Sequence, residues 1–193
     1  MSCFRFRFRF CLLLLAITLL AAGCTLVAPS YTPDYSSLDT LKRQHLSKLA
    51  VGPFEPKDPG AGVNSIGLRG SALKSPSGSF AQYLEDAVIA DLRDINLLDN
   101  NATLKLTGLL LTNDIDISGF SIGSGLISAE FTLTRDGATV FSKQIDARTR
   151  FESSFAGAIA IPKAQIEYPV LVRALLNELY SDRDFIRALQ APP

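Results

Sequence analysis

Apolar and polar residues alternate most regularly near the middle of the chain. Four apolar residues share one phase of residues 125–135: Ile127, Ala129, Phe131 and Leu133. A period of two predicts a strand with one face on the core. The dipeptide Asp136-Gly137 follows, and both of its positions tolerate the positive φ of a tight two-residue turn. Residues 138–150 are therefore predicted to return as the paired strand.

The returning strand leaves one question about its register. With Asp136-Gly137 as the whole loop, Val140 faces Leu133, while Phe141 and Ile145 fall on the opposite face. A β-bulge would restore them to the core. Without a bulge, the second face carries an apolar strip that could serve as a docking surface.

Helical periodicity appears on either side of these strands. After a capping serine, Ser77 or Ser79, apolar residues recur at spacings of three and four: Phe80, Leu84, Ala87, Val88, Leu92 and Ile95. Three carboxylates, Glu85, Asp86 and Asp91, are predicted on the solvated side of this helix, and no His or Cys joins them as a metal ligand. A second apolar stripe predicts a helix that ends near Tyr180: Ile166, Val170, Leu171, Ala174, Leu175 and Leu179. Asp182 can cap a last short helix.

Two more strands are predicted, at residues 46–54, where Pro53 marks an edge or an end, and at residues 102–112. The order strand, long loop, helix, three strands, helix predicts a single α+β domain over residues 47–190. Its architecture would be a two-layer sandwich, with the helices packed on one face of a mixed, mostly antiparallel sheet. We expect residues 113–124 to form a loop. Its Asp114-x-Asp116 pair resembles the start of a calcium loop but lacks the later ligands.

The N-terminus predicts where the protein is located. Arg5, Arg7 and Arg9 precede an apolar run that ends in small residues, the order of a secretory signal. The sequence Leu20-Ala21-Ala22-Gly23-Cys24 resembles the lipobox of bacterial lipoproteins. That resemblance implies a signal peptide over residues 1–23 and acyl chains, such as palmitate, on Cys24. An uncleaved membrane helix is the alternative, although the strongly apolar run is short for one. Both interpretations place the remaining chain outside the cytoplasm.

Residues 24–46 are predicted to be an acylated tether, because prolines and serines interrupt any period there. The stretch from Leu38 to Leu46 could instead pack on the domain as a short helix. By the sorting pattern of such lipoproteins, Thr25 after the cysteine implies the periplasmic face of the outer membrane. The membrane is thus one expected partner, reached through Cys24.

Composition and charge exclude several classes of function. Three of the 19 Lys and Arg residues and none of the 19 Asp and Glu residues lie in the signal, so the mature chain carries 16 − 19 = −3. A mildly acidic chain without a basic block argues against a nucleic-acid partner. Cys24 would be the only cysteine left, so no disulfide is expected. No nucleophile–base pair can be assembled around the single histidine, His45. We therefore expect no enzymatic activity, no metal and no cofactor.

The candidate binding residues lie in the two longest irregular segments. The predicted loop over residues 55–78 holds Arg69 and Lys74, which could steer an anionic partner or a lipid headgroup. These residues lack the Gly-Lys-Ser/Thr ending of a phosphate loop. The segment over residues 151–162 holds Phe155, Ile159 and Ile161, which would supply apolar contacts. The alternative is that this segment only covers the sheet as part of the core.

The element order also resembles that of small envelope lipoproteins. These include LptE-type lipopolysaccharide-assembly lipoproteins, auxiliary lipoproteins of ABC-type lipid transporters and YajG-like lipoproteins. The stretches that carry the likeness are Leu49-Ala50-Val51-Gly52-Pro53, the Phe80–Leu92 helix, the Leu104–Gly108 strand, the Asp136-Gly137 hairpin and the closing Leu175–Tyr180 helix. The resemblance implies a binding or assembly factor in the envelope, with a protein or lipid partner. A regulator of a peptidoglycan-synthesising enzyme is the alternative.

Overall fold

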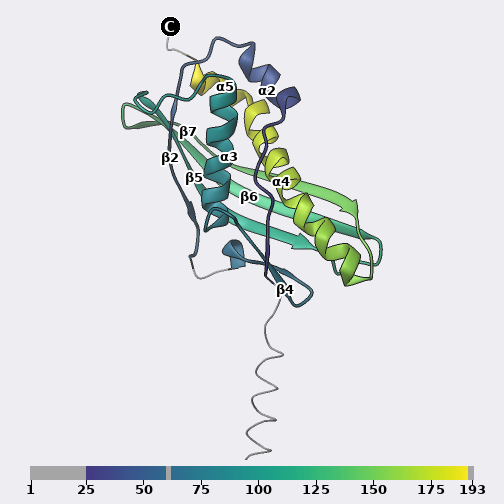
Figure 1. Ribbon diagram of the computed structural model, residues 1–193. Coiled ribbons are helices and arrows are strands. Elements are labelled where there is room, and N and C mark those ends of the chain that lie inside the picture. The colour runs from purple at the N-terminus through teal and green to yellow at the C-terminus, as the bar shows by residue number, and fades with distance from the viewer. Residues whose placement is uncertain (1–24, 60–61, 191–193) are drawn as a thin grey trace, which may run out of the picture.

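Two layers make up the fold in the computed structural model, which describes residues 25–59 and 62–190 (Figure 1). The larger sheet has the order β2-β5-β6-β7, with β2 and β5 parallel and the other pairs antiparallel. Its strands are β2 (Ala50–Pro56), β5 (Leu104–Asp116), β6 (Ile122–Arg135) and β7 (Ala138–Glu152). This mixed, mostly antiparallel sheet with its helices confirms the predicted α+β class.

The two long helices, α3 (Phe80–Asp94) and α4 (Gly157–Ser181), lie across one face of this sheet (Figure 1). The Ser79 hydroxyl caps α3 by accepting a hydrogen bond from the Gln82 N–H at 3.0 Å. Asp182 caps α5 (Arg183–Leu189) in the same way, through two backbone N–H groups. Within the described residues, no helix combines the length and the apolar character that crossing a bilayer requires.

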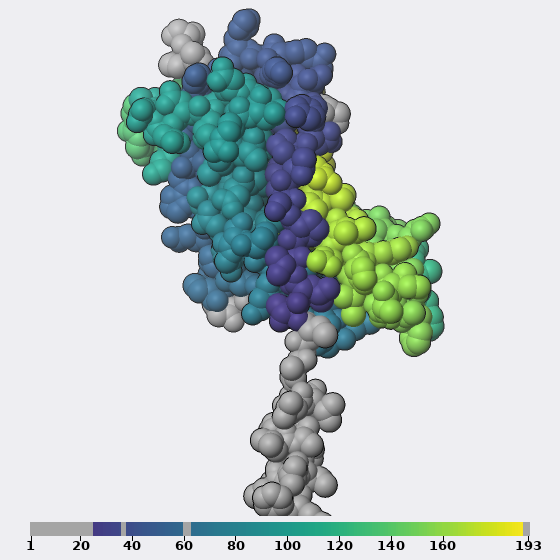
Figure 2. Space-filling model, viewed as in Figure 1, coloured from purple at the N-terminus to yellow at the C-terminus, as the bar shows by residue number. Residues whose placement is uncertain are grey.

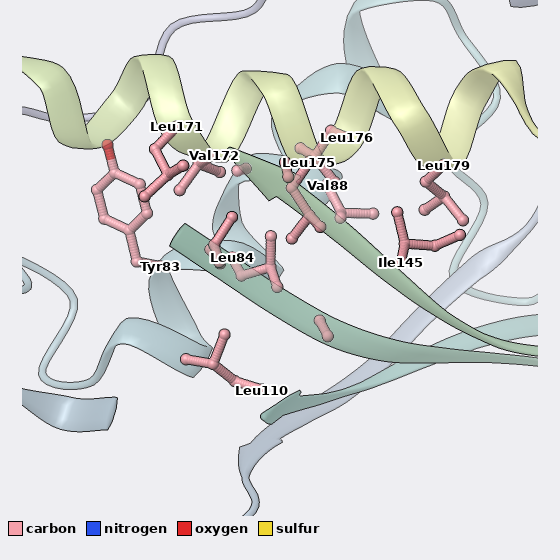
Figure 3. Close-up of a cluster of buried hydrophobic side chains, with 14 of the residues drawn as sticks. Tyr83, Leu84, Val88, Leu110, Ile145, Leu171, Val172, Leu175, Leu176 and Leu179 are labelled. Atoms are coloured by element: carbon pink, nitrogen blue, oxygen red, sulfur yellow. The ribbon is translucent and has the colours of Figure 1, made fainter. Parts of the chain in front are cut away.

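The core lies between the helices and the sheet (Figure 3). Leu84 and Val88 of α3 and Leu175 of α4 are fully buried there, as their spacing predicted. The other residues expected in the core are also fully buried: Phe80, Phe131, Leu133 and Leu171. Burial of these side chains removes apolar surface from water, which is the main stabilising contribution of the two-layer packing.

A β-bulge resolves the register of the β6–β7 hairpin. Leu133 pairs with Phe141 while Thr134 pairs with Thr139, so Val140 has no partner residue in β6. Phe141 and Ile145 are 7% exposed, whereas Val140 is 41% exposed. The bulge thus returns both apolar side chains to the core, and no continuous apolar strip is left on the outer face.

The predicted long loop after β2 contains regular structure. It forms a 3₁₀ turn, η1 (Gly62–Asn64), and an antiparallel hairpin of β3 (Ile66–Leu68) and β4 (Ser71–Lys74). Leu68 and Leu73 are fully buried. The predicted loop over residues 55–78 therefore contains two short strands, and β4 in particular was not expected, because three- and four-residue strands give too few alternations to be recognised.

The predicted tether is a structured part of the domain. Immediately after Cys24, residues 25–27 form β1 (Thr25–Val27), which pairs in parallel with β4 to make a small sheet of order β1-β4-β3. Helix α2 (Tyr35–Lys42) follows, with Leu38 and Leu41 buried. We call residues 25–42 the N-terminal strap; in Figure 2 its first part lies between α3 and α4. The apolar residues of this segment show no regular period in the sequence, but contacts with distant residues bury Ala28, Leu38 and Leu41.

Two further boundaries differ from expectation and change where the candidate residues lie. The predicted loop over residues 113–124 is shorter, because β5 continues to Asp116 and β6 begins at Ile122. Likewise, most of the predicted loop over residues 151–162 belongs to β7 or to the first turns of α4. Asp116 lies at the end of β5, and its carboxylate accepts the Ser118 N–H at 2.7 Å, which lowers the pKa of that carboxyl.

Candidate functional site

Four large apolar side chains are exposed at one end of the molecule, and two of them, Phe120 and Phe155, are in contact. Their exposed fractions are 80% for Phe120, 56% for Ile122, 70% for Phe155 and 51% for Ile159. The rings of Phe120 and Phe155 stack, with centroids 5.3 Å apart and planes 17° apart. We call these four residues the terminal patch. Clustered exposed apolar residues are typical of interaction surfaces, whereas single ones are common on any protein.

Arg69 holds the loops of this patch together. It lies at the β3–β4 turn with φ at 50°. Its guanidinium donates hydrogen bonds to the backbone oxygens of Phe155, Ile117 and Gly119, and it lies 5.8 Å from the Phe155 ring centroid. One side chain thereby joins the β3–β4 turn, the β5–β6 loop and the β7–α4 connection. A guanidinium used in this way positions the patch, and its charge is largely committed to those carbonyls.

The terminal patch lies at the end where the chain enters the fold. Thr25 pairs with Ala72, which follows the Arg69-Gly70 turn by two residues. A hydrogen bond from the Ser153 N–H to the Ser121 carbonyl, 2.8 Å long, joins the two loops that carry Phe120 and Phe155. Figure 1 shows the start of β1, the β3–β4 turn and the first turn of α4 at the same end. Cys24 precedes Thr25 directly in the chain.

The remaining sequence-predicted residues lie elsewhere. Lys74 is exposed at the other end of β4, roughly 10 Å from Ser71 at about 3.3 Å per residue. Ile161 is partly buried and packs against the core, so it does not share the exposure of Ile159. The structure thus brings Arg69 and Phe155 into contact, with Ile159 exposed four residues after Phe155, whereas Lys74 lies at the other end of β4 and Ile161 packs against the core.

Sequence reasoning missed two of the four residues of the terminal patch. Phe120 and Ile122 fell in a predicted loop, where isolated apolar residues carry no signal. On α4, Ile166 and Val170 were predicted to be buried but are 63% and 38% exposed. Together with Ile159 they recur at i, i+7 and i+11, which places them on one face. That second stripe was hidden because α4 is apolar on most of its circumference.

A buried carboxylate forms a second cluster, between the strap and both long helices. Asp91 of α3 is 1% exposed, so its predicted place on a solvated helix face was wrong. The Tyr31 hydroxyl lies 3.0 and 2.9 Å from its two oxygens, and the Tyr180 hydroxyl donates to Oδ2 at 3.0 Å. These bonds supply the partners that a buried charge requires.

Burial raises the pKa of Asp91 from 3.8 to about 6, against the opposing effect of hydrogen bonds from Tyr31 and Tyr180. Burial also raises the pKa of Tyr180, and the nearby Asp91 charge adds to this effect. Further hydrogen bonds hold the strap against α3 and α4: the Tyr83 hydroxyl donates to the Pro29 carbonyl at 2.7 Å, and the Gln165 amide donates to the Val27 carbonyl at 2.6 Å. Asp91 therefore holds the strap against α3 through its hydrogen bond from Tyr31, and it is not a solvent-exposed acid.

The open face of the large sheet carries a shallow hollow. Glu55, Thr107, Glu130 and Thr132 are among its lining residues. Glu130 accepts a hydrogen bond from the Ser142 hydroxyl at 3.0 Å. His45 is exposed after α2. Across residues 25–59 and 62–190, no three His, Cys, Asp or Glu side chains group as metal ligands.

Comparisons with known proteins relate the chain to others by fold alone. No protein-family model matches the sequence, and no curated protein matches it. The crystal structure of a Xanthomonas campestris protein described as DUF330 superposes with a TM-score of 0.53 at 16% identity, covering 81% of this chain and 93% of that one. A minor lipoprotein from Acinetobacter baumannii gives a TM-score of 0.44 at 12% identity, with coverages of 77% and 98%.

Proposed function

We propose that this chain is an outer-membrane lipoprotein, anchored through acylated Cys24 and facing the periplasm. We propose further that it acts there without catalysis, as a binding or assembly factor in lipid or lipopolysaccharide transport or as an accessory of a membrane complex. The lipobox-like sequence supports the anchor. The observation that carries the binding role is the terminal patch, an exposed apolar surface with two stacked aromatic rings.

The strap bears on the choice between this role and regulation of a peptidoglycan-synthesising enzyme. A lipoprotein that reaches such an enzyme through the wall needs a long flexible linker after its acylated cysteine. Here Thr25, the next residue, already pairs with Ala72. A short attachment keeps the domain beside the membrane and favours a partner that is at the membrane or within it.

The anchor is tested by replacing its thiol. In the Cys24→Ala variant, fatty-acid labelling should disappear and the precursor should remain uncleaved or misplaced. A Ser30→Ala variant serves as the control, because Ser30 is exposed and six residues away. Labelling that persists in Cys24→Ala would refute the proposed lipidation, and fractionation of the wild type with the inner membrane would refute the proposed location.

The binding role is tested in cells that lack the chain. Loss of an assembly or transport factor should make the outer membrane permeable to large hydrophobic antibiotics, and the wild-type gene should restore the barrier. The Phe120→Ser/Phe155→Ser variant should restore it less well while remaining folded and acylated. An unchanged barrier combined with altered peptidoglycan crosslinking would instead support the regulatory alternative.

A further inference from the structure

We propose that the terminal patch is a membrane-contact surface, which rests on the bilayer that holds Cys24 and buries its apolar side chains among the lipid headgroups and upper acyl chains. This inference rests on the proposed acylation of Cys24. It adds an orientation to that function: the end of the domain with Phe120, Ile122, Phe155 and Ile159 faces the lipid, and the opposite end faces the periplasm.

The place where the chain enters the fold decides which end meets the bilayer. Adjacent Cα atoms are about 3.8 Å apart, so Thr25 lies within a few ångströms of the acylated residue. Thr25 cannot move away from the domain, because β1 pairs with β4 and the Ala28 N–H donates to the Lys74 carbonyl at 2.9 Å. The anchor therefore holds the Arg69-Gly70 turn, and with it the terminal patch, at the level of the headgroups.

The distribution of exposed residues suits this orientation. Phenylalanine and isoleucine side chains at a membrane interface gain from burial in the boundary between headgroups and acyl chains. At the far end, the exposed turn residues Asn100, Asn101, Asp136 and Gly137 are polar or small, and the exposed apolar side chain beside them is Val140. The Asp136 N–H donates to the Thr103 carbonyl at 3.2 Å, which joins those two turns. One end is thus suited to lipid and the other to water.

A bilayer suits the patch better than a soluble partner does. An attached ligand meets its site at a high effective concentration, so weak apolar contacts are populated without high intrinsic affinity. Two of the charged groups nearby have partners, and the Glu152 side chain remains 94% exposed. The Arg69 guanidinium is bonded to carbonyls, and Glu152, which pairs with Ile122 across the strands, lies 3.7 Å from the Lys163 ammonium. The two loops of the patch are also held rigidly, which lowers the entropic cost of contact.

The test uses the full acylated lipoprotein, reconstituted into vesicles of phosphatidylethanolamine and phosphatidylglycerol. Because Cys24 would be the only cysteine of the mature chain and its thiol would be acylated, an added cysteine can be labelled alone. A polarity-sensitive fluorophore is placed on Ile122→Cys, on Ile159→Cys and on the control Val140→Cys, which is 41% exposed beside the Asp136-Gly137 turn. Spin-labelled lipids should quench the first two several-fold more strongly than the third.

Fatty-acid labelling of each variant is measured first, so that the two proposals can fail separately. Absence of acylation would refute the anchor and this inference together. Acylation with equal quenching at residues 122, 159 and 140 would refute the membrane contact alone. Quenching by aqueous iodide is measured as well. If the probes at residues 122 and 159 are shielded from iodide but are not quenched by spin-labelled lipid, another copy or another protein covers the patch, and the inference is overturned. Thermal unfolding checks that all three variants remain folded.

Discussion

At the scale of single residues, Asp91 shows how one polar side chain can fasten distant parts of a chain. It accepts hydrogen bonds from Tyr31, 60 residues before it, and from Tyr180, 89 residues after it. Its sequence neighbours gave no sign of this, because burial of a carboxylate depends on partners that only the folded chain supplies. Periodicity placed Asp91 beside Asp86 on a solvated face, and that placement holds for Asp86 alone.

Titration of Asp91 should make the stability of the fold depend on pH. Its pKa is about 6 in the folded chain and near 3.8 when exposed, so between these values the folded state holds a proton that the unfolded state has lost. The associated stabilisation, about 3 kcal/mol, is fully present below pH 3.8 and is lost as the pH rises through about 6. Urea unfolding of wild type and Asp91→Asn across this range should show the loss in wild type only.

Wild type and Asp91→Asn must be compared because other carboxylates titrate in the opposite sense. The pKa of Asp116, for example, is lowered by the Ser118 N–H, so that group favours the folded state at higher pH. Asp86→Asn, on the exposed side of the same helix, is the matched control and should keep the wild-type slope. If Asp91→Asn also keeps that slope, Asp91 is not the titrating group.

At the scale of elements, local patterns predicted those elements whose own sequence determines them. The β6–β7 hairpin, with alternation on both sides of Asp136-Gly137, and α3, with Ser79 as its cap, form as expected. Of the strap, only a short helix near Leu38 was considered, as an alternative to a tether, and α2 agrees with it. Strands β1 and β4 were not expected, because each is short and is stabilised by residues far away in the chain. Two of the four residues of the terminal patch were named from the sequence, because Phe155 and Ile159 belong to a recognisable apolar segment. Phe120 and Ile122 were not named, because their role depends on residues that only the fold brings near them.

The strap should contribute measurably to stability. A free tether would tolerate any substitution, but Leu41 of α2 is fully buried. Leu41→Ala should lower the free energy of unfolding by about 2–5 kcal/mol, through lost transfer energy and the cavity left behind. The control Thr40→Ala, at an exposed position of the same helix, should change it by no more than about 0.5 kcal/mol. Equal effects in denaturant titrations would mean that α2 does not pack as described.

At the scale of the whole molecule, one apolar cluster runs from Ala28 and Leu38 of the strap through both long helices to the sheet. A continuous core of this kind should unfold in one cooperative transition. The five tyrosines include Tyr31, Tyr83 and Tyr180 at the strap interface, and the chain has no tryptophan. Tyrosine fluorescence therefore reports on the strap and far-UV circular dichroism on all elements. Their thermal midpoints should coincide; an earlier fluorescence transition would show that the strap detaches first.

The parallel pairing of β1 with β4 also determines how the domain bears mechanical load. If the envelope moves relative to a partner of the domain, the force enters at Thr25 and runs along the axis of β1, while the hydrogen bonds to β4 run across it. Loaded in shear, these bonds share the force and must break together, whereas bonds pulled from the side would open one after another. The next hydrogen bonds along the strap join Tyr83 to the Pro29 carbonyl and Tyr31 to Asp91. If Cys24 carries the proposed lipid, a pull on that lipid is passed from a three-residue strand to the two long helices of the fold.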